Sequence, residues 1–445
     1  MTVSSAAWPS RSMPSMYIDR KSLGMLLVMV VGALANHHES HGQSLLYAAS
    51  TPPDRAAQLR NQRWIETIER EVPPLKHETG DRLPMIMWHG VGFDSLSQRE
   101  IDVLRQRGLV QHLQMDVAMI PAARALQSAG VPVILMQGRT DNWPYSLAKN
   151  GDDWAHQFDL SYQPTWFGKE DAFEWHGACP NQIAGWSVLQ QQTRQTMQAF
   201  RDAGVDIAGV WMDYEGDPYP WSHLFDQLQH CRRCRAELPP NIVQDKNAWR
   251  TFAWQRYVEL YDQHFAKPIR EVYPDSLVTN WHVVFSTADD PVRYFVRDIL
   301  LPPLSPRHFS ATNPIAYGSD LVWHERSKTT DAATQNSVDL FYSNEILQQV
   351  RTDLVNRRAL GKQNVKSIPW VARVCKIDTS DRKAPVMTRE SYRRALVQLW
   401  QYDIATMQIF NPLHDGSEEL AITEIQDAVL AYDEFLGQQS NAANN

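Results

Sequence analysis

The stretch "VDIAGVWMDYE", from Val205 to Glu215, decides the fold. Its centre is a short apolar run that follows the helical run "VLQQQTRQTMQAFRDAG", so it predicts a buried strand. The run ends in Asp213 and Glu215, which stand two positions apart and therefore point to the same side of an extended chain. Two neighbouring buried carboxyl groups are costly unless one keeps a proton. The pattern indicates a chemical site at the end of a strand.

Seven further apolar runs alternate with helical runs along the chain. Together they predict strands over residues 83–90, 109–115, 131–138, 205–215, 276–285, 311–318, 367–374 and 405–412. Eight such strands favour an α/β fold of the (β/α)8 TIM-barrel type, with a doubly wound open sheet as the alternative. We expect the barrel over 81–435, an N-terminal extension over 36–80 with one helix, and a disordered tail over 436–445.

Residues 1–35 predict a secretory signal peptide. Basic residues Arg11, Arg20 and Lys21 precede the apolar run Leu23–Ala35, which ends in a small-x-small cleavage pattern. The run is too short to span a bilayer comfortably, and an uncleaved anchor is the alternative. We expect a secreted or periplasmic protein that has no membrane contact after signal cleavage.

Composition and motifs narrow the function classes. The 445 residues are 43% hydrophobic and 21% charged, which is typical of a globular protein. A net charge of −8 without a dense basic tract argues against nucleic-acid binding. Dinucleotide, P-loop, serine-hydrolase and H-E-x-x-H motifs are missing from the sequence, so we expect no cofactor and no metal. The 16 Trp and 15 Tyr suit a sugar-binding groove or large core side chains.

The four cysteines leave two alternatives open. They are Cys179, Cys231, Cys234 and Cys375. Cys231 and Cys234 form a C-x-x-C pair, which in an oxidising compartment favours a local disulfide. A structural zinc site that adds Cys179 and a nearby histidine, His223 or His230, is the other interpretation.

Chemistry in such a barrel lies at the carboxyl ends of the strands. Carboxyl groups surrounded by aromatic rings suit glycoside hydrolysis, in which one acid protonates the leaving oxygen. We predict that Glu215 is this acid, that Asp213 is its charged partner, and that the substrate is a polysaccharide or oligosaccharide. The predicted substrate-binding residues at the other strand ends are Trp88, His89, Arg139, Trp143, Trp281, Asp320, Trp323, Arg373 and Asn411.

Two segments resemble known glycosidases. "GVWMDYEG" resembles the fourth-strand D-x-D-x-E motif of family 18 chitinases and the hyaluronidase strand that ends in D-x-E, and "NPIAYGSDLVW" resembles the sixth-strand Tyr-x-Asp region of chitinases. The resemblance implies that Glu215 is the acid/base, that Asp213 orients an N-acetyl group, and that Tyr317 supports an intermediate formed by the substrate's own acetamide. This sequence departs from the motifs, because Trp211 replaces the first Asp and Gly-Ser separates Tyr317 from Asp320.

Several alternatives remain open at this stage. The acidic pair could lie in a solvated turn, with Asp213 capping the following segment. A retaining glycosidase would need a separate carboxylate nucleophile, for which Asp320, Glu345 or Asp378 is available. A barrel that binds carbohydrate without cleaving it is the alternative from another functional class, and a metal-dependent hydrolase is a third.

Overall fold

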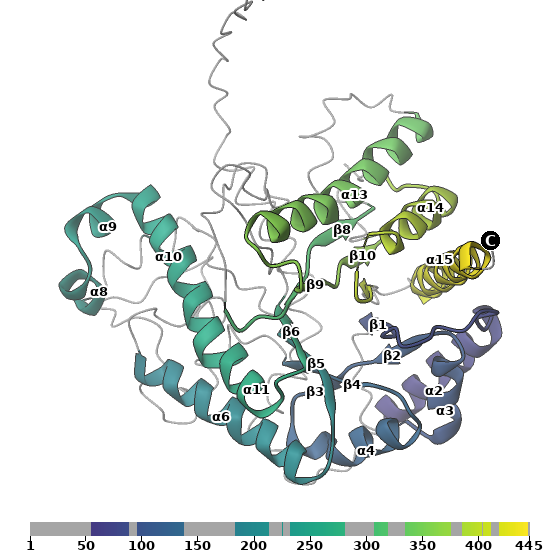
Figure 1. Cartoon of the computed structure of the whole chain (residues 1–445), viewed down its shortest axis with the longest axis horizontal. Helices are drawn as coiled ribbons and strands as arrows, with labels where there is room; N and C mark the ends of the chain where they lie inside the picture. Colours follow the sequence, from purple (N-terminus) through teal and green to yellow (C-terminus); the bar gives the residue numbers. More distant parts are fainter. Residues whose placement is uncertain are drawn as a thin grey trace, which may run out of the picture. The chain divides into compact units, whose positions relative to one another are not determined.

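The computed structural model describes residues 55–88, 96–137, 183–212, 225, 232–280, 307–318, 334–374, 385–402, 404–410 and 418–443. All of them belong to one compact unit, which spans Ala48–Asn445. The predicted signal peptide lies outside the described residues. The described part is a mixed α/β structure in which helices pack around parallel sheets (Figure 1).

The strands confirm the positions that the sequence predicts. They are β1 (Met85–Trp88), β2 (Leu109–Gln111), β3 (Leu113–Gln114), β4 (Val133–Gln137), β5 (Ile207–Met212), β6 (Leu277–Asn280), β7 (Ala311–Thr312), β8 (Ile315–Tyr317), β9 (Lys366–Ser367), β10 (Trp370–Ala372) and β11 (Gln408–Phe410). Each of the eight predicted segments contains at least one of these strands. Three of the segments are split, because a residue or two between the halves leaves the regular pairing.

Every strand pairing in the described part is parallel. One sheet has the order β2-β1-β11-β10-β8, a second has the order β3-β4-β5-β6, and a third joins β7 to β9. The segment 109–114 carries β2 and β3, so it pairs with β1 at one end and with β4 at the other. Ser310 N donates to Val278 O at 2.9 Å, which links β6 to the residue before β7. The contacts therefore pass from each segment to the next along the chain and return from β11 to β1.

The helices lie between the strands along the chain. They are α2 (Arg55–Glu71), α3 (Gln98–Arg105), a short 3-10 turn η1 (Val117–Met119), α4 (Ile120–Ser128), α6 (Ile183–Asp202), α8 (Arg232–Glu237), α9 (Pro240–Gln244), α10 (Lys246–Tyr261), a π-helical turn η5 (Asp262–Ala266), α11 (Lys267–Val272), α13 (Gln335–Ala359), α14 (Arg389–Trp400) and α15 (Glu418–Ala443). The helices that the sequence predicts before the third, fourth, fifth and eighth strands are confirmed as α4, α6, α10–α11 and α14.

Side-chain caps explain where several helices begin. Ser97 and Glu100 form a capping box at the start of α3. The Asp245 carboxylate accepts the backbone N–H groups of Asn247 and Ala248 at the start of α10. Thr388 caps α14 by accepting from the Ser391 amide. Each cap satisfies amides that have no acceptor within their own helix.

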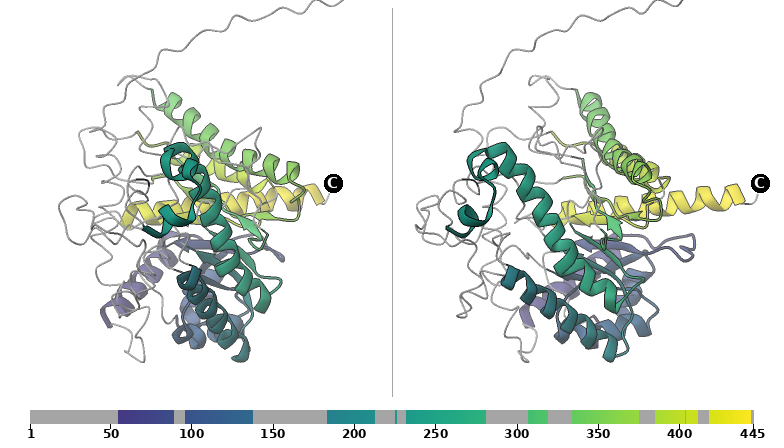
Figure 2. Two further views of the ribbon diagram at one scale, coloured as in Figure 1. Left: turned by 90° about the vertical axis from the view of Figure 1, so that its left-hand side faces the viewer. Right: turned by 60° about the vertical axis from the view of Figure 1, so that its left-hand side comes forward.

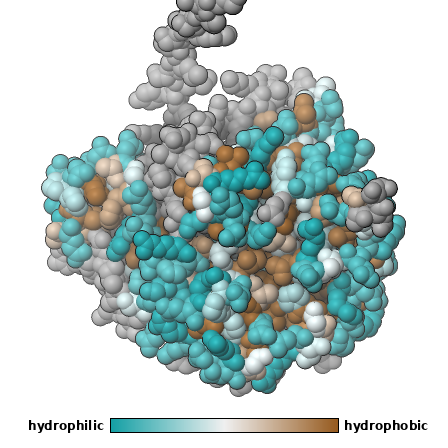
Figure 3. All heavy atoms as spheres, in the orientation of Figure 1, coloured by the Kyte–Doolittle hydropathy of each residue, from teal (hydrophilic) through white to brown (hydrophobic). Residues whose placement is uncertain are grey.

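Two hydrophobic clusters fill the described part. One gathers α6, α10, α11 and the strands β4, β5 and β6. The other gathers α2, α13, α14, α15 and the outer faces of β8, β10 and β11. Figure 2 shows α11 beside α6, and α13 lying over the segment that includes β8. Hydrophilic residues cover most of the described surface in the view of Figure 3, as expected when the apolar faces are buried.

The described half of the N-terminal extension packs on α3 and α15. Arg107, which is 4% exposed, donates from Nε to Val72 O at 2.6 Å and from Nη2 to Glu69 O at 2.9 Å. Lys76 and His77 donate their backbone N–H groups to the Asp433 carboxylate of α15. These hydrogen bonds fix the segment that joins α2 to β1.

The end of α15 differs from the disordered tail predicted from residue 436. The helix continues to Ala443. Leu436 is buried, Gly437 lies against the His77 ring, and Ser440 Oγ donates to Leu436 O at 3.0 Å. Leu436 and Gly437 therefore pack against the rest of the described part, and residues 438–442 are exposed on the last turns of the helix. Within the described residues, no helix is both long and apolar enough to cross a membrane.

Candidate functional site

The strands bring their carboxyl ends together because all their pairings are parallel. Trp88 of β1 is level with Phe410 of β11, and Ala372 of β10 is level with Tyr317 of β8. In the second sheet, Met212 at the end of β5 is level with Gln137 of β4 and Asn280 of β6. Each sheet therefore has one edge at which its carboxyl ends lie side by side.

Four aromatic side chains form a connected row, which we call the aromatic row: Trp211, Trp370, Phe410 and Tyr317. Phe410 and Tyr317 end their strands and Trp211 is the last residue but one of β5, whereas Trp370 begins the three-residue strand β10. The ring centroids of Trp211 and Trp370 are 4.6 Å apart at an interplanar angle of 81°. The ring centroids of Trp370 and Phe410 are 5.2 Å apart. The Phe410 ring stacks on the Tyr317 ring, with centroids 5.6 Å apart and an interplanar angle of 20°. Edge-to-face and offset contacts of this kind are the favourable arrangements of aromatic rings. The row joins β5 to the three strands β10, β11 and β8.

The strand register shows which face of each sheet carries the aromatic row. Trp211 is level with Thr279 of β6 and Met136 of β4, and Trp370 is level with Gln408 of β11. Partners in a parallel pair point to the same face of the sheet. Because Trp211 and Trp370 touch, this face of the second sheet is turned toward the corresponding face of the first.

Most of the predicted site residues lie outside the described residues. Asp213 directly follows the last residue of β5, and neither Asp213 nor Glu215 is described. The same holds for the substrate-binding candidates His89, Arg139, Trp143, Trp281, Asp320, Trp323 and Asn411. Trp88 is described in its backbone alone. Their predicted roles stay predictions, and the side chains that can be placed are Tyr317 and Arg373.

Tyr317 lies in the aromatic row. It is the last residue of β8, it is partly buried, and its ring stacks on Phe410. Pairing of β8 with β10 sets its position, because Ala372 is its partner in the register. The phenol therefore lies at the carboxyl edge of the first sheet.

Arg373 lies on the opposite face of its strand. Trp370 and Ala372 share the face of the aromatic row, so alternation turns Val371 and Arg373 toward the helices. Arg373 Nη1 donates to Met387 O at 3.3 Å, just before α14. Its charge acts on Glu424 of α15 and on Tyr392 of α14. The structure thus groups Arg373 with these buried side chains and not with Tyr317.

Glu424 is a buried acid that reasoning from the sequence missed. It is 2% exposed, and its Oε1 accepts the Val374 backbone N–H at 2.7 Å. Burial raises the pKa of Glu424 to about 8, although the Val374 amide and the Arg373 charge oppose this shift. A signal was present in the sequence: Glu424 follows Ala421 by three positions and precedes Ala428 by four, which places it on the apolar stripe of α15.

His112 is a second polar residue that the sequence reasoning did not select. It stands between β2 and β3, where the chain changes its pairing partner from β1 to β4. The side chain is 5% exposed, and its Nδ1 lies 3.2 Å from Met87 O. Burial lowers the pKa of His112 to about 4, so the ring is neutral at ordinary pH.

Three of the four cysteines on which the disulfide and zinc hypotheses depend lie outside the described residues. Cys234 is buried in α8, whereas Cys179, Cys231 and Cys375 lie outside the described ranges. Within those ranges, no group of three His, Cys, Asp or Glu side chains could hold a metal ion.

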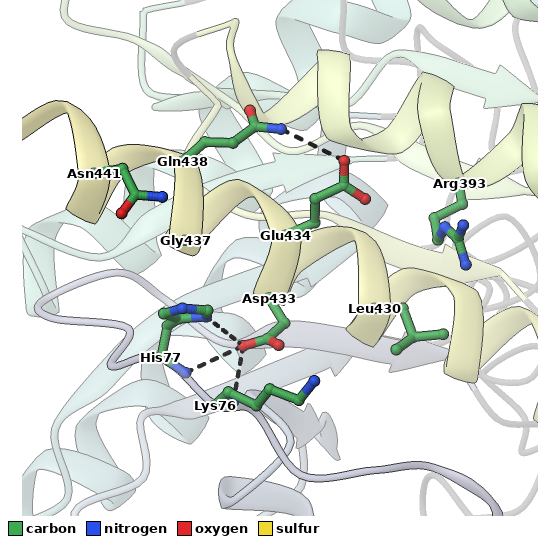
Figure 4. Close-up of a pocket in the computed structure, with 9 residues that line it drawn as sticks. All are labelled: Lys76, His77, Arg393, Leu430, Asp433, Glu434, Gly437, Gln438 and Asn441. Atoms are coloured by element: carbon green, nitrogen blue, oxygen red, sulfur yellow. Dashed lines mark hydrogen bonds and ion pairs between the residues drawn. The ribbon is translucent and has the colours of Figure 1, made fainter.

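A surface pocket of about 420 Å³ lies between α14, α15 and the segment before β1 (Figure 4). Its lining residues are Lys76, His77, Arg393, Leu430, Asp433, Glu434, Gly437, Gln438 and Asn441. Asp433 is held by the Lys76 and His77 amides at 2.8 and 3.1 Å and by His77 Nδ1 at 2.9 Å. Burial alone would raise the pKa of Asp433, but these hydrogen bonds lower it below its ordinary value. The pocket contains no predicted site residue and no strand residue, so we assign its interactions to the docking of the extension.

Comparison with known proteins gives no family for this chain. No family model matches it, and no curated protein is similar to it at a significant level. A bee venom hyaluronidase bound to a hyaluronic acid tetramer matches 56% of this chain and 75% of its own, with 12% identity and a TM-score of 0.29. A chitinase from Chromobacterium violaceum matches 78% and 99%, with 9% identity and a TM-score of 0.35. The protein BpGH50 matches 88% and 90%, with 9% identity and a TM-score of 0.41. Since all three TM-scores are below 0.5, these likenesses define neither the fold nor the activity of this chain.

Proposed function

We propose that this chain is a secreted glycoside hydrolase with a (β/α)8 barrel, which cleaves O-glycosyl bonds of a polysaccharide or oligosaccharide. In this proposal Glu215 is the proton donor, Asp213 is its charged partner, and Tyr317 contributes a supporting hydroxyl group.

The order of strand contacts supports a closed barrel. Eight parallel segments contact one another in chain order, and β11 pairs with β1. An open doubly wound sheet would have two unpaired edges and a reversal of strand order at its centre. A closed barrel is the simplest arrangement in which β1 pairs with β2 on one side and with β11 on the other.

The observation that carries the functional proposal is the direction of Trp211 at the end of β5. Trp211 belongs to the aromatic row, and its side chain meets Trp370 of the first sheet. Continued alternation along β5 would point Asp213 and Glu215 to this same face, above the row. A carboxyl pair above an aromatic floor at the carboxyl edge of parallel strands is the arrangement that sugar hydrolysis requires.

The chemistry follows from the different reach of the two acids. Two close carboxyl groups cannot both ionise easily, so the pKa of one rises and that group keeps its proton. Glu215 is longer and farther along the strand, so it would protonate the leaving oxygen. Asp213 would stay charged and orient an N-acetyl group, and the acetamide oxygen of the sugar would attack the anomeric carbon. Tyr317, held by Phe410 at the edge of β8, would hydrogen bond to the intermediate.

Most of the remaining predicted contacts stay in the proposal as substrate-binding residues. Trp88 is the last residue of β1, and its backbone is level with Phe410 of the aromatic row. His89, Arg139, Trp143, Trp281, Asp320, Trp323 and Asn411 keep their predicted roles at the strand ends. Arg373 is assigned to a supporting position instead, because its described contacts are with the helix layer.

The test is the substitution Glu215→Gln, assayed on a panel of glycans that includes N-acetylated oligosaccharides. The variant keeps the size of the side chain but cannot donate a proton as an acid, so turnover should fall by at least about 100-fold while ligand affinity is retained. Glu237→Gln, at an exposed position of α8, is the matched control and should keep full activity. Full activity in Glu215→Gln would overturn the assignment, and glycan binding without turnover in the wild type would favour a carbohydrate-binding protein.

A further inference from the structure

A buried acid lies directly behind the carboxyl end of β10. Glu424 is 2% exposed and projects from the apolar stripe of α15. Its Oε1 accepts the backbone N–H of Val374 at 2.7 Å, two residues beyond the last residue of β10. The carboxyl group therefore contacts the main chain where the strand leaves the sheet.

Charged and titratable groups face Glu424 from the elements around it. Arg373 comes from the end of β10, Tyr392 from α14, and Asp427 from the next turn of α15. The Asp427 carboxylate is already engaged, because Arg389 of α14 donates to both of its oxygens at 2.8 Å. Arg373 is thus the cation that acts on Glu424.

Three buried polar atoms around Glu424 make no hydrogen bond in the described part of the chain. Among the described residues, Glu424 Oε2, Tyr392 Oη and Arg373 Nε are buried and have no hydrogen-bond partner. Arg373 Nη1 instead contacts Met387 O at the long distance of 3.3 Å. A guanidinium held by one long contact can turn to a new acceptor at little cost, and an ionised Glu424 would be a stronger acceptor than a carbonyl.

We propose that Glu424 is a proton-binding positioning residue for the carboxyl end of β10. As a neutral acid it holds the Val374 amide while Arg373 stays on Met387. When Glu424 loses its proton, the carboxylate pairs with Arg373, and the end of the strand shifts toward α15. This role does not depend on glycoside hydrolysis, since it is a property of the β10–α14–α15 packing.

The pH range follows from the direction of the shift. Burial raises the pKa of Glu424 to about 8 in the folded chain, whereas an unfolded chain has the ordinary value of 4.5. Between these values the unfolded state binds fewer protons than the folded state, so stability falls as pH rises. The contribution of the neutral acid is complete below pH 4.5 and is lost as pH rises through 8.

The first test compares the wild type with Glu424→Gln in thermal unfolding between pH 5 and pH 9. Glutamine has the shape of the neutral acid and cannot ionise, so the variant should lose less stability than the wild type toward pH 9, by about 5 °C in the unfolding midpoint. Glu434→Gln, at an exposed position on the same helix, should follow the wild type. Parallel curves for the wild type and Glu424→Gln would overturn the proposal.

A second measurement protects the test against a variant that fails to fold. Carbon NMR of glutamate side-chain carboxyl groups in the wild-type protein should show one glutamate that titrates near pH 8. Arg373→Met should move this titration to higher pH, because it removes the cation that favours the charged form. A spectrum in which every glutamate titrates below pH 6 would contradict the proposal. Neither measurement needs a substrate, so its failure is separate from failure of the glycosidase assignment.

Discussion

Asp353 and Glu424 are both buried behind the strands, and they differ in their partners. Asp353 of α13 is fully buried behind β7 and β9, where its Oδ2 accepts Thr312 Oγ1 at 2.7 Å and Arg357 Nε at 3.2 Å. Glu424 of α15 is 2% exposed, and its Oε1 accepts a hydrogen bond from the neutral Val374 amide at 2.7 Å. Burial raises the pKa of Asp353 to about 6 and that of Glu424 to about 8.

The comparison shows what a direct cationic partner contributes. Burial opposes the ionisation of both acids. Contact with Arg357 and the hydrogen bond from Thr312 lower the pKa of Asp353 against this effect. Arg373, in contrast, acts on Glu424 without an ion pair, and the Asp427 charge raises the Glu424 pKa further. The pKa of Asp353 therefore stays below 7, and the group is charged at neutral pH. Glu424 keeps its proton instead, because an acid that is buried without an ion pair is more stable in its neutral form.

The largest expected effect comes from removing the cation beside Asp353. Arg357→Met leaves a buried carboxylate without its ion pair, so the free energy of unfolding should fall by about 3–5 kcal/mol at pH 8. Urea unfolding measures this loss, with Arg358→Met as the matched control at the next, exposed position. The loss should be smaller at pH 5, where Asp353 can take up a proton. Equal losses of stability in the two variants would contradict the prediction, because they would show that the Arg357–Asp353 ion pair does not stabilise the fold.

A smaller effect is expected from Arg389→Met, which changes the surroundings of Glu424. The substitution removes two charge-assisted hydrogen bonds from the buried Asp427 carboxylate. Because the Arg389 side chain is 44% exposed, solvent screening reduces the loss to about 1–2 kcal/mol. The uncompensated Asp427 charge should also shift the Glu424 titration to higher pH in carbon NMR. An unchanged titration would mean that Asp427 does not influence Glu424.

The smallest effect is expected from the neutral partner of Asp353. Thr312→Val removes the hydroxyl group that donates to Oδ2, which should lower the free energy of unfolding by about 1 kcal/mol. Thr312→Ser keeps the hydroxyl group and should retain most of the stability, as measured by urea unfolding of both variants. A larger loss in the Ser variant than in the Val variant would assign the effect to methyl packing and not to the hydrogen bond.

Much of the fold can be predicted from local patterns. The run before Asp213 becomes β5, and the helical spacing of Trp249, Phe265 and Ile269 becomes the buried face of α10, η5 and α11. These predictions succeed because the periods of strands and helices differ, so apolar spacing distinguishes them. The parallel sheets follow from the alternation of strands and helices.

The candidate site could be predicted less completely. Tyr317 lies at a strand end as expected, but Arg373, one residue past the end of its strand, faces the helices. In a strand of three residues a shift of one position reverses the direction of every side chain, and the sequence gives no register. The carboxyl pair at 213 and 215 lies outside the described residues, so its prediction rests on the direction of Trp211.

By itself, the sequence determined the order of the strands and the helices before the third, fourth, fifth and eighth strands, because these depend on spacing within one segment. Only the tertiary structure decided that Trp211 meets Trp370, that Asp353 lies beside Arg357, and that Glu424 faces the end of β10. The physical reason is that a pKa or a side-chain contact depends on neighbours far away in the chain, whose positions are fixed only when the sheets and helices pack together.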